Sequence, residues 1–155
     1  RSLYEKALNH DYTERFIGDI KTPVKYATHE LRKMLARVDT SLTENFIKKE
    51  IPQEFQEAYE RRFAEGKDDT LEGKILSVAD KIDLMYESFG EIQKGNPEPV
   101  YMDIYKSSLT AIMKFREMAS VQYFLKKILP ELLKDNADAN AKNQLAIATT
   151  QIIQQ

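Results

Sequence analysis

An imidazole and a carboxylate stand next to each other near the start of the chain, and both side chains are types that bind metal ions. The sequence has two histidines, and one of them, His10, directly precedes Asp11, with Glu14 one helical turn later. On a helix, His10 and Glu14 would share a face because they are four residues apart, while Asp11 would lie about 100° round the axis. The pair could therefore hold a metal ion with Glu14 alongside. The alternative is an ordinary surface or capping pair.

A third candidate ligand, Asp80, lies far along the chain. It stands inside an apolar stretch, residues 75–84, whose spacing predicts a buried helix. A carboxylate in a core needs a partner, since an unpaired buried charge costs several kcal/mol. A divalent metal ion would be such a partner. The alternative is a solvated stripe in which Asp80 lies near Lys81 or Asp83 and faces water.

Residue types that are absent or scattered exclude other kinds of site. The chain has no cysteine, which rules out a disulfide framework, a cysteine nucleophile and a thiolate metal site. Its five glycines are scattered, so a glycine-rich phosphate loop is excluded. The G-x-S-x-G elbow of serine hydrolases does not occur either. Carboxylate and imidazole chemistry remains.

The elements that must position these residues have helical hydrophobic spacing almost throughout. The first helix is expected to run to Gly18 and to be followed by a loop up to Pro23, which biases Thr22 away from helical angles. Thr28 can cap the next helix, whose apolar stripe extends to Phe46.

Two more helices are expected in the middle of the chain. A short one lies between Pro52 and Gly66, and Asp69 with Glu72 has the spacing of a capping box at the start of a long one. The long helix has apolar residues in alternating steps of four and three, at Leu71, Ile75, Val78, Ile82, Met85, Phe89 and Ile92.

The sequence from residue 95 onwards predicts a break, a further apolar series and a tail. Two prolines within residues 95–99 end the long helix, and the next series runs from Ile104 to Pro130. Residues 136–155 are rich in Ala, Asn and Gln and form either a packed terminal helix or a frayed tail. Because no two-residue alternation appears, we expect an all-α fold, an irregular bundle of six or so helices in a single domain, residues 1–155.

The composition is that of a soluble globular protein, with 42% hydrophobic and 31% charged residues. The formal net charge is -2 with both signs interspersed, so neither a nucleic-acid polymer nor a membrane is an expected partner. No apolar run approaches the roughly 20 residues that span a bilayer, and a cytoplasmic location is expected. The chain starts with Arg1 and enters a helical pattern at once, so we expect that it was cut from something longer.

Four stretches, in order, resemble one known family. They are His10-Asp11-x-x-Glu14, then Gly18-Asp19-Ile20-x-Thr22-Pro23-Val24-Lys25-Tyr26, then Ala79-Asp80, and Gly95-Asn96 after the long helix. Together they look like the YfbR-like branch of the HD-domain phosphohydrolases, the 5'-deoxynucleotidases. The resemblance extends from residue 1 to about residue 133, and the second stretch is its most diagnostic part.

The resemblance implies roles for the matching positions. His10, Asp11 and Asp80 would be ligands of a divalent metal ion, and Glu14 would be the catalytic carboxylate that positions or deprotonates the attacking water. The sugar and phosphate pocket would be lined by Asp19, Ile20, Lys21 and Thr22, with Asp19 at a sugar hydroxyl and Asp80 also close to the substrate. Nitrogen and oxygen ligands suit manganese, cobalt or magnesium. A nucleoside monophosphate would be the substrate, and a homodimer is possible.

The chain also departs from the family pattern. The family has a further histidine ligand and a phosphate-gripping arginine on helices that precede the point where this chain begins. The second histidine, His29, falls at the start of a helix beyond the loop, and we interpret it as a capping or surface residue. Two hypotheses follow. One is a phosphohydrolase of (deoxy)nucleoside 5'-monophosphates, and the other is a non-catalytic HD-like interaction module with an incomplete metal site.

Overall fold

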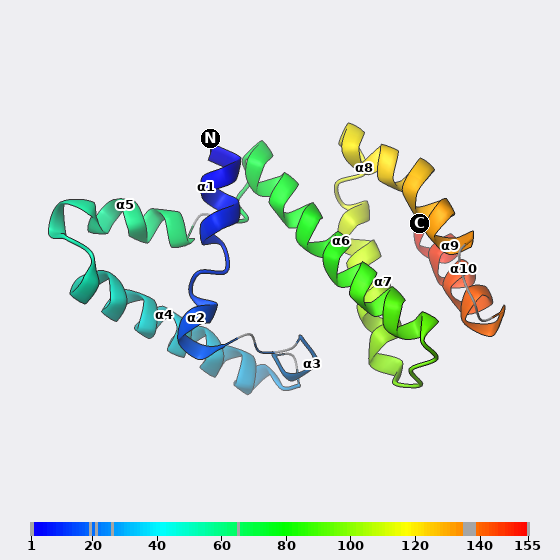
Figure 1. Ribbon diagram of the computed structural model, residues 1–155, viewed down its shortest axis with the longest axis horizontal. Coiled ribbons are helices and arrows are strands. Elements are labelled where there is room, and N and C mark those ends of the chain that lie inside the picture. The colour runs from blue at the N-terminus through cyan, green and yellow to red at the C-terminus, as the bar shows by residue number, and fades with distance from the viewer. Residues whose placement is uncertain are drawn as a thin grey trace. The chain divides into compact units, whose positions relative to one another are not determined.

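The computed structural model describes residues 2–18, 20, 22–25, 27–64, 66–134 and 139–154. In these residues the regular structure is entirely helical, with no strand, which confirms the expected all-α class (Figure 1). The helices are shorter and more numerous than expected, since the part of the chain that the structure describes forms ten α-helices and one π-helix in place of six or so.

The chain divides into two compact units, residues 1–76 and residues 77–155, and each is described by itself. The helices of the first unit are α1 (Ser2–Asn9), α2 (Glu14–Ile17), α3 (Thr22–Lys25), α4 (His29–Glu50) and α5 (Gln53–Ala64), and α6 (Leu71–Gln93) begins in it. Organisation as a single domain stays a prediction. The described residues contain no helix that is both long enough and apolar enough to cross a bilayer.

The prediction of one continuous helix up to Gly18 is wrong, because α1 ends at Asn9 and turns follow. The N–H of Tyr12 donates to the Asn9 carbonyl at 3.1 Å, and the N–H of Glu14 donates to the Asp11 carbonyl at 3.0 Å, so these bonds span three residues instead of four. Residues 9–13 are all of types with below-average helix propensity, and the Asn9 side chain donates to the Glu5 carbonyl. The apolar spacing had hidden this break.

The segment between α2 and α4 also differs from the expected loop. Gly18 ends α2 with a positive φ of 78°, a conformation that glycine adopts without strain. Thr22 lies inside α3 instead of outside a helix, because a proline in the first turn costs no main-chain hydrogen bond. The Thr28 cap of α4 is confirmed, since its hydroxyl accepts from the Leu31 N–H at 3.1 Å. His29 is the exposed first residue of α4, as expected.

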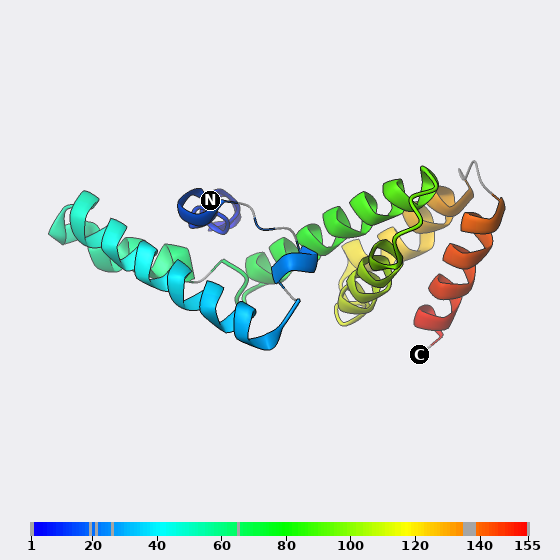
Figure 2. The same ribbon diagram turned by 90° about the horizontal axis from the view of Figure 1, so that it is seen from below.

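Aromatic rings hold the first unit together. Tyr12 stacks on Phe63 with ring centroids 5.0 Å apart, and Phe16 lies 5.3 Å from Phe46. The guanidinium of Arg15 covers the Tyr12 ring at 5.1 Å. These contacts hold the turn before α2 against α5, and α2 against α4, and α4 also contacts α5 (Figure 2).

The start of α6 is capped, but not by the predicted Asp69 and Glu72. The Thr70 hydroxyl accepts from the Gly73 N–H at 3.1 Å, and the Thr70 N–H in turn donates to the Asp68 carboxylate at 3.2 Å. Asp68 also pairs with a residue of α1, since the Lys6 ammonium lies 2.6 Å from its Oδ2. The cap therefore ties the beginning of α6 to α1 within the first unit.

The second unit has a core of large apolar side chains. Besides the rest of α6 it contains α7 (Pro99–Met113), α8 (Ala119–Tyr123), the π-helix η1 (Phe124–Ile128), α9 (Leu129–Lys134) and α10 (Ala139–Ile153). The predicted stripe of α6 is largely confirmed, since Val78, Met85, Phe89 and Ile92 are buried, whereas Leu71 is 63% exposed.

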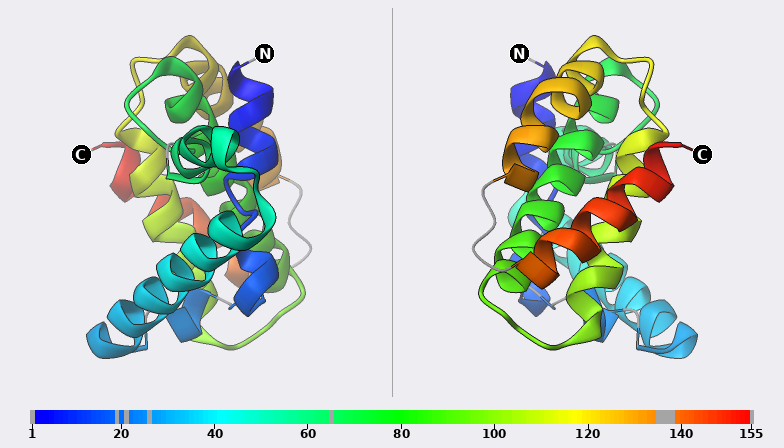
Figure 3. Two further views of the ribbon diagram at one scale, coloured as in Figure 1. Left: turned by 90° about the vertical axis from the view of Figure 1, so that its left-hand side faces the viewer. Right: turned by 90° about the vertical axis from the view of Figure 1, so that its right-hand side faces the viewer.

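The apolar series expected up to Pro130 is interrupted and continues past that residue. The N–H of Leu129 bonds to the Phe124 carbonyl five residues back, the mark of a π-turn, and Pro130 then lies in the first turn of α9. Within the tail, Ala139–Ile153 form helix α10 (Figure 3). This helix is packed, since Leu145 is buried and the Thr149 hydroxyl is 2.7 Å from that of Tyr105.

Candidate active site

His10 lies in the turn between α1 and α2, with both ring nitrogens engaged. Nδ1 is 2.9 Å from the Ala7 carbonyl oxygen, which can only accept, so Nδ1 carries the proton of this bond. Nε2 is 2.8 Å from Asp11 Oδ2. His10 is 19% exposed, and Asp11 is 52% exposed. The ring orientation is thus set by main chain on one side and leaves Nε2 beside a carboxylate on the other.

The distance between His10 Nε2 and Asp11 Oδ2 suits two ligands of one divalent metal ion. A histidine that donates from Nδ1 to a main-chain carbonyl presents Nε2 as the ligand, the usual arrangement behind metal-bound imidazoles. Ligand atoms at about 2.1 Å from a metal and roughly at right angles lie about 3 Å apart, close to the 2.8 Å between Nε2 and Oδ2. In the described residues, however, no group of three His, Cys, Asp or Glu side chains could hold a metal. A third ligand is needed.

Gly66, which follows α5, packs directly against His10. A Cβ built on this buried glycine would lie 2.9 Å from the His10 Cβ and 3.3 Å from its Cα. Any other residue would push the histidine away. The sequence had indicated Gly66 only as the end of a helix, because a contact across 56 positions leaves no local signal.

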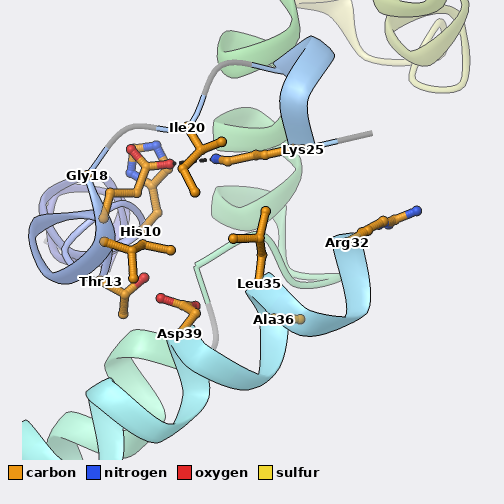
Figure 4. A pocket seen from close by; sticks show the side chains of 11 residues that line it. His10, Thr13, Gly18, Ile20, Lys25, Arg32, Leu35, Ala36 and Asp39 are labelled. Atoms are coloured by element: carbon orange, nitrogen blue, oxygen red, sulfur yellow. Dashed lines mark hydrogen bonds and ion pairs between the residues drawn. The ribbon is translucent and has the colours of Figure 1, made fainter. Parts of the chain in front are cut away.

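A cavity of about 210 Å³ opens beside His10 in the first unit (Figure 4). His10 and Glu14 both line it. They were expected to lie together on one face of a single helix, but His10 lies in the turn before α2 and Glu14 is the first residue of α2. The full lining consists of His10, Thr13, Glu14, Ile17, Gly18, Ile20, Lys25, Arg32, Leu35, Ala36 and Asp39.

Charged residues of α2, α3 and α4 contribute to the lining of this cavity. Lys25 Nζ donates to Glu14 Oε1 at 3.1 Å, and Arg32 and Asp39 line the cavity from α4 (Figure 4). A second hollow of about 610 Å³ shares His10, Thr13 and Asp39 with the first. Sequence reasoning gave no role to Lys25, Arg32 or Asp39, and the two on α4 carry no motif that marks them.

Comparison with known proteins identifies the family. The model of the 5'-deoxynucleotidase YfbR-like family matches residues 1–132. The chain belongs to the YfbR-like family. Two 5'-deoxynucleotidases, from Vibrio vulnificus and Shewanella oneidensis, are each 27% identical over 124 residues, which cover 80% of this chain and 62% of the relative. The chain therefore spans about three fifths of these curated relatives.

A solved structure supports the same fold. The crystal structure of an HD-domain phosphohydrolase from Listeria innocua has a TM-score of 0.83 and 60% sequence identity to this chain. The match covers 99% of this chain and 72% of that one. The resemblance to the HD-domain phosphohydrolases and to their YfbR-like branch is thus confirmed.

The remaining residues that the YfbR-like pattern indicated are placed only in part. Ile20 lines the cavity, and that this cavity is the sugar and phosphate pocket stays a prediction. Asp19 and Lys21 lie outside the described residues, and Thr22 is described only as the first residue of α3.

Asp80 belongs to the second unit, on α6. It is 25% exposed, and its Oδ2 is 3.2 Å from the Lys81 ammonium. An ion pair with Lys81 is what the alternative interpretation expected, while partial burial is what the ligand hypothesis expected. That Asp80 shares an ion with His10 and Asp11 of the first unit stays a prediction.

Proposed function

We propose that this chain provides the metal-binding part of a phosphohydrolase that releases phosphate from (deoxy)nucleoside 5'-monophosphates. The observation that carries the proposal is the oriented His10 ring, whose Nε2 lies beside Asp11 Oδ2 next to a cavity that Glu14 also lines. Membership of the YfbR-like family and the names of the relatives support the substrate class. The metal is proposed as manganese, cobalt or magnesium.

In the proposed site His10, Asp11 and Asp80 hold the metal ion. Once bound, such an ion lowers the pKa of water and polarises a phosphoryl oxygen, so a nucleophile is available near neutral pH. Glu14 orients that water by accepting one of its protons. Its Oε1 already accepts a hydrogen bond from Lys25, so Oε2 is the oxygen that would accept the proton from the water.

The other proposed contacts concern the substrate. Ile20 lines the cavity, and Asp19, Lys21 and Thr22 are proposed to line the sugar and phosphate pocket with it. Asp80 would also approach the substrate. The oxygen of the water attacks phosphorus, and the bond between phosphorus and the 5' oxygen breaks. The 5' oxygen then takes up the proton that Glu14 received from the water. A homodimer remains part of this proposal, and light scattering on the purified protein tests it.

The second candidate is a non-catalytic helical interaction module that keeps the HD scaffold. One observation favours it, namely that in the described part of the chain no three potential ligands come together. The two candidates make opposite predictions about metal-dependent activity.

Phosphate release by the full-length natural protein decides between them. We expect release from dAMP and AMP with manganese, cobalt or magnesium, and loss of activity on chelation. Asp11→Asn should abolish release, whereas Asp69→Asn, on an exposed aspartate away from the cavity, should leave it unchanged. No release with any of these metals, or release that chelation does not affect, would leave the interaction module as the better account.

A further inference from the structure

A lysine bridges two sides of the cavity. Lys25 is the last residue of α3, and Glu14 is the first residue of α2. The Lys25 Nζ donates a hydrogen bond to Glu14 Oε1 at 3.1 Å (Figure 4). The two side chains are 35% and 34% exposed, so the pair lies at the rim between solvent and cavity. Eleven positions separate them, and the intervening segment is the one whose motif indicates the substrate pocket.

We propose that Lys25 is the positioning residue of Glu14, which holds the carboxylate so that its second oxygen is directed at the attacking water. This inference rests on the proposed function, in which Glu14 accepts a proton from that water. It adds a residue to which neither the sequence motif nor the ligand set gives a role.

Glu14 needs such an anchor because the element that carries it is short. A helix of four residues has almost no stability of its own, and a glutamate side chain gives up conformational entropy when it is fixed. The N–H of Gly18 bonds to the Glu14 carbonyl, which secures the main chain only. The side chain is secured at Oε1 by Lys25, and this leaves Oε2 for the water.

Charge gives a second reason for a cation at this place. A phosphate monoester carries a charge of about −1.5 to −2 near neutral pH, and it must approach the Glu14 carboxylate. The Lys25 ammonium offsets the negative charge of Glu14 in advance. Because arginine carries the same charge and can also donate to Oε1, Lys25→Arg should preserve the function in part.

Steady-state kinetics of the full-length protein with dAMP test this inference. We expect Lys25→Met to lower kcat by about 30-fold to 100-fold, the range for a misplaced general base, and to change KM by less than about 3-fold. Lys25→Arg should remain within about 5-fold of the wild-type kcat. Lys49→Met, on an exposed lysine of α4 outside the cavity, is the matched control and should behave like wild type.

A double-mutant cycle shows whether Lys25 acts through Glu14. In a Glu14→Gln background, Lys25→Met should lower kcat by no more than about 3-fold further, because the group that it positions is already lost. If the two losses multiply, or if Lys25→Met raises KM alone, Lys25 contacts the substrate directly and the inference is wrong. Circular dichroism checks that helix content is unchanged, and Lys25→Gln replaces Lys25→Met if that variant does not fold.

The outcomes separate this inference from the proposed function. A wild-type protein without metal-dependent release would overturn the proposed function. A wild-type protein with such release, and a Lys25→Met variant that matches Lys49→Met, would overturn the role of Lys25 alone.

Discussion

The two units of the chain differ in how they are held together. In the first unit, α1, α2 and α5 contain no fully buried residue, and ring contacts and ion pairs connect its elements. In the second unit, Tyr105, Leu109 and Ile112 of α7 are completely buried. The first unit thus keeps polar side chains accessible, and the second has a buried core of mainly apolar side chains.

This difference suggests a division of roles. Side chains that bind a metal and a charged substrate must stay reachable, so they cannot form a dense core. Stability should therefore be most sensitive to changes in the second unit, and chemistry to changes in the first unit and at Asp80, the proposed ligand from the second. The following predictions test that division, from the largest expected effect to the smallest.

Removing a core side chain of the second unit should have the largest effect. Leu109 is 0% exposed, and Leu109→Ala should lower the free energy of unfolding by about 2–5 kcal/mol, since it deletes buried methyl groups and leaves a cavity. Urea denaturation measures this. Leu71→Ala, at a leucine that is 63% exposed, is the control and should cost well under about 1 kcal/mol. Equal losses in the two variants would contradict the comparison.

Adding one methyl group beside His10 should disturb the first unit. Gly66→Ala puts a Cβ 2.9 Å from that of His10, and we expect a loss of about 1–3 kcal/mol of unfolding free energy, as in other overpacked sites. Metal binding should weaken as well, because His10 must move. Denaturation and calorimetric metal titration measure the two effects.

The matched control for this change lies in the second unit. A Cβ at Gly90 of α6 meets nothing within 4 Å, so Gly90→Ala should raise stability by about 0.5–1 kcal/mol through helix propensity. If Gly66→Ala is as harmless as Gly90→Ala, the close packing at His10 is not a constraint on the site.

The buried hydroxyl pair of the second unit should matter less than its apolar core. Tyr105 O–H lies 2.7 Å from the Thr149 hydroxyl, and burial raises the pKa of Tyr105. Thr149→Val leaves the tyrosine without this partner and should cost about 1–2 kcal/mol in unfolding free energy. Thr150→Val, on an exposed residue whose hydroxyl bonds to the Ala146 carbonyl of its own helix, should cost less. The reverse order in thermal denaturation would be evidence against the role of this pair.

The smallest effect concerns the ion pair at the start of α6. Hydrogen bonds from Lys6 and Thr70 lower the pKa of Asp68 from 3.8 to about 2. Since the folded pKa is the lower one, the stabilisation is present above about pH 4 and is lost as the pH falls through about 2. The difference in urea midpoint between wild type and Asp68→Asn should therefore shrink towards zero on acidification. Asp69→Asn, at an exposed neighbour, should show no such trend.

Features that depend on neighbouring residues in the sequence were predictable in both units. The steps of four and three between Val78 and Ile92 predicted the buried face of α6 because a helix repeats every 3.6 residues. The Thr28 cap was also predictable, since capping is local.

Features of the first unit were harder to predict because they depend on packing between distant residues. The apolar spacing before Gly18 predicted a continuous helix. The helix breaks at His10 because the residues there have low helix propensity. The ion pair between Lys25 and Glu14 and the contact of Gly66 with His10 arise only when separate elements meet. The motif indicated candidate site residues, but not the contacts that support each of them.

The central claim is that Asp80 completes the ligand set begun by His10 and Asp11, and metal content tests it most directly. Elemental analysis of the full-length protein should find one divalent ion per chain in the wild type and in Asp103→Ala, a control at an exposed aspartate of α7. Asp80→Ala should lose the ion while circular dichroism shows unchanged helix content. A fully loaded Asp80→Ala protein would contradict the account.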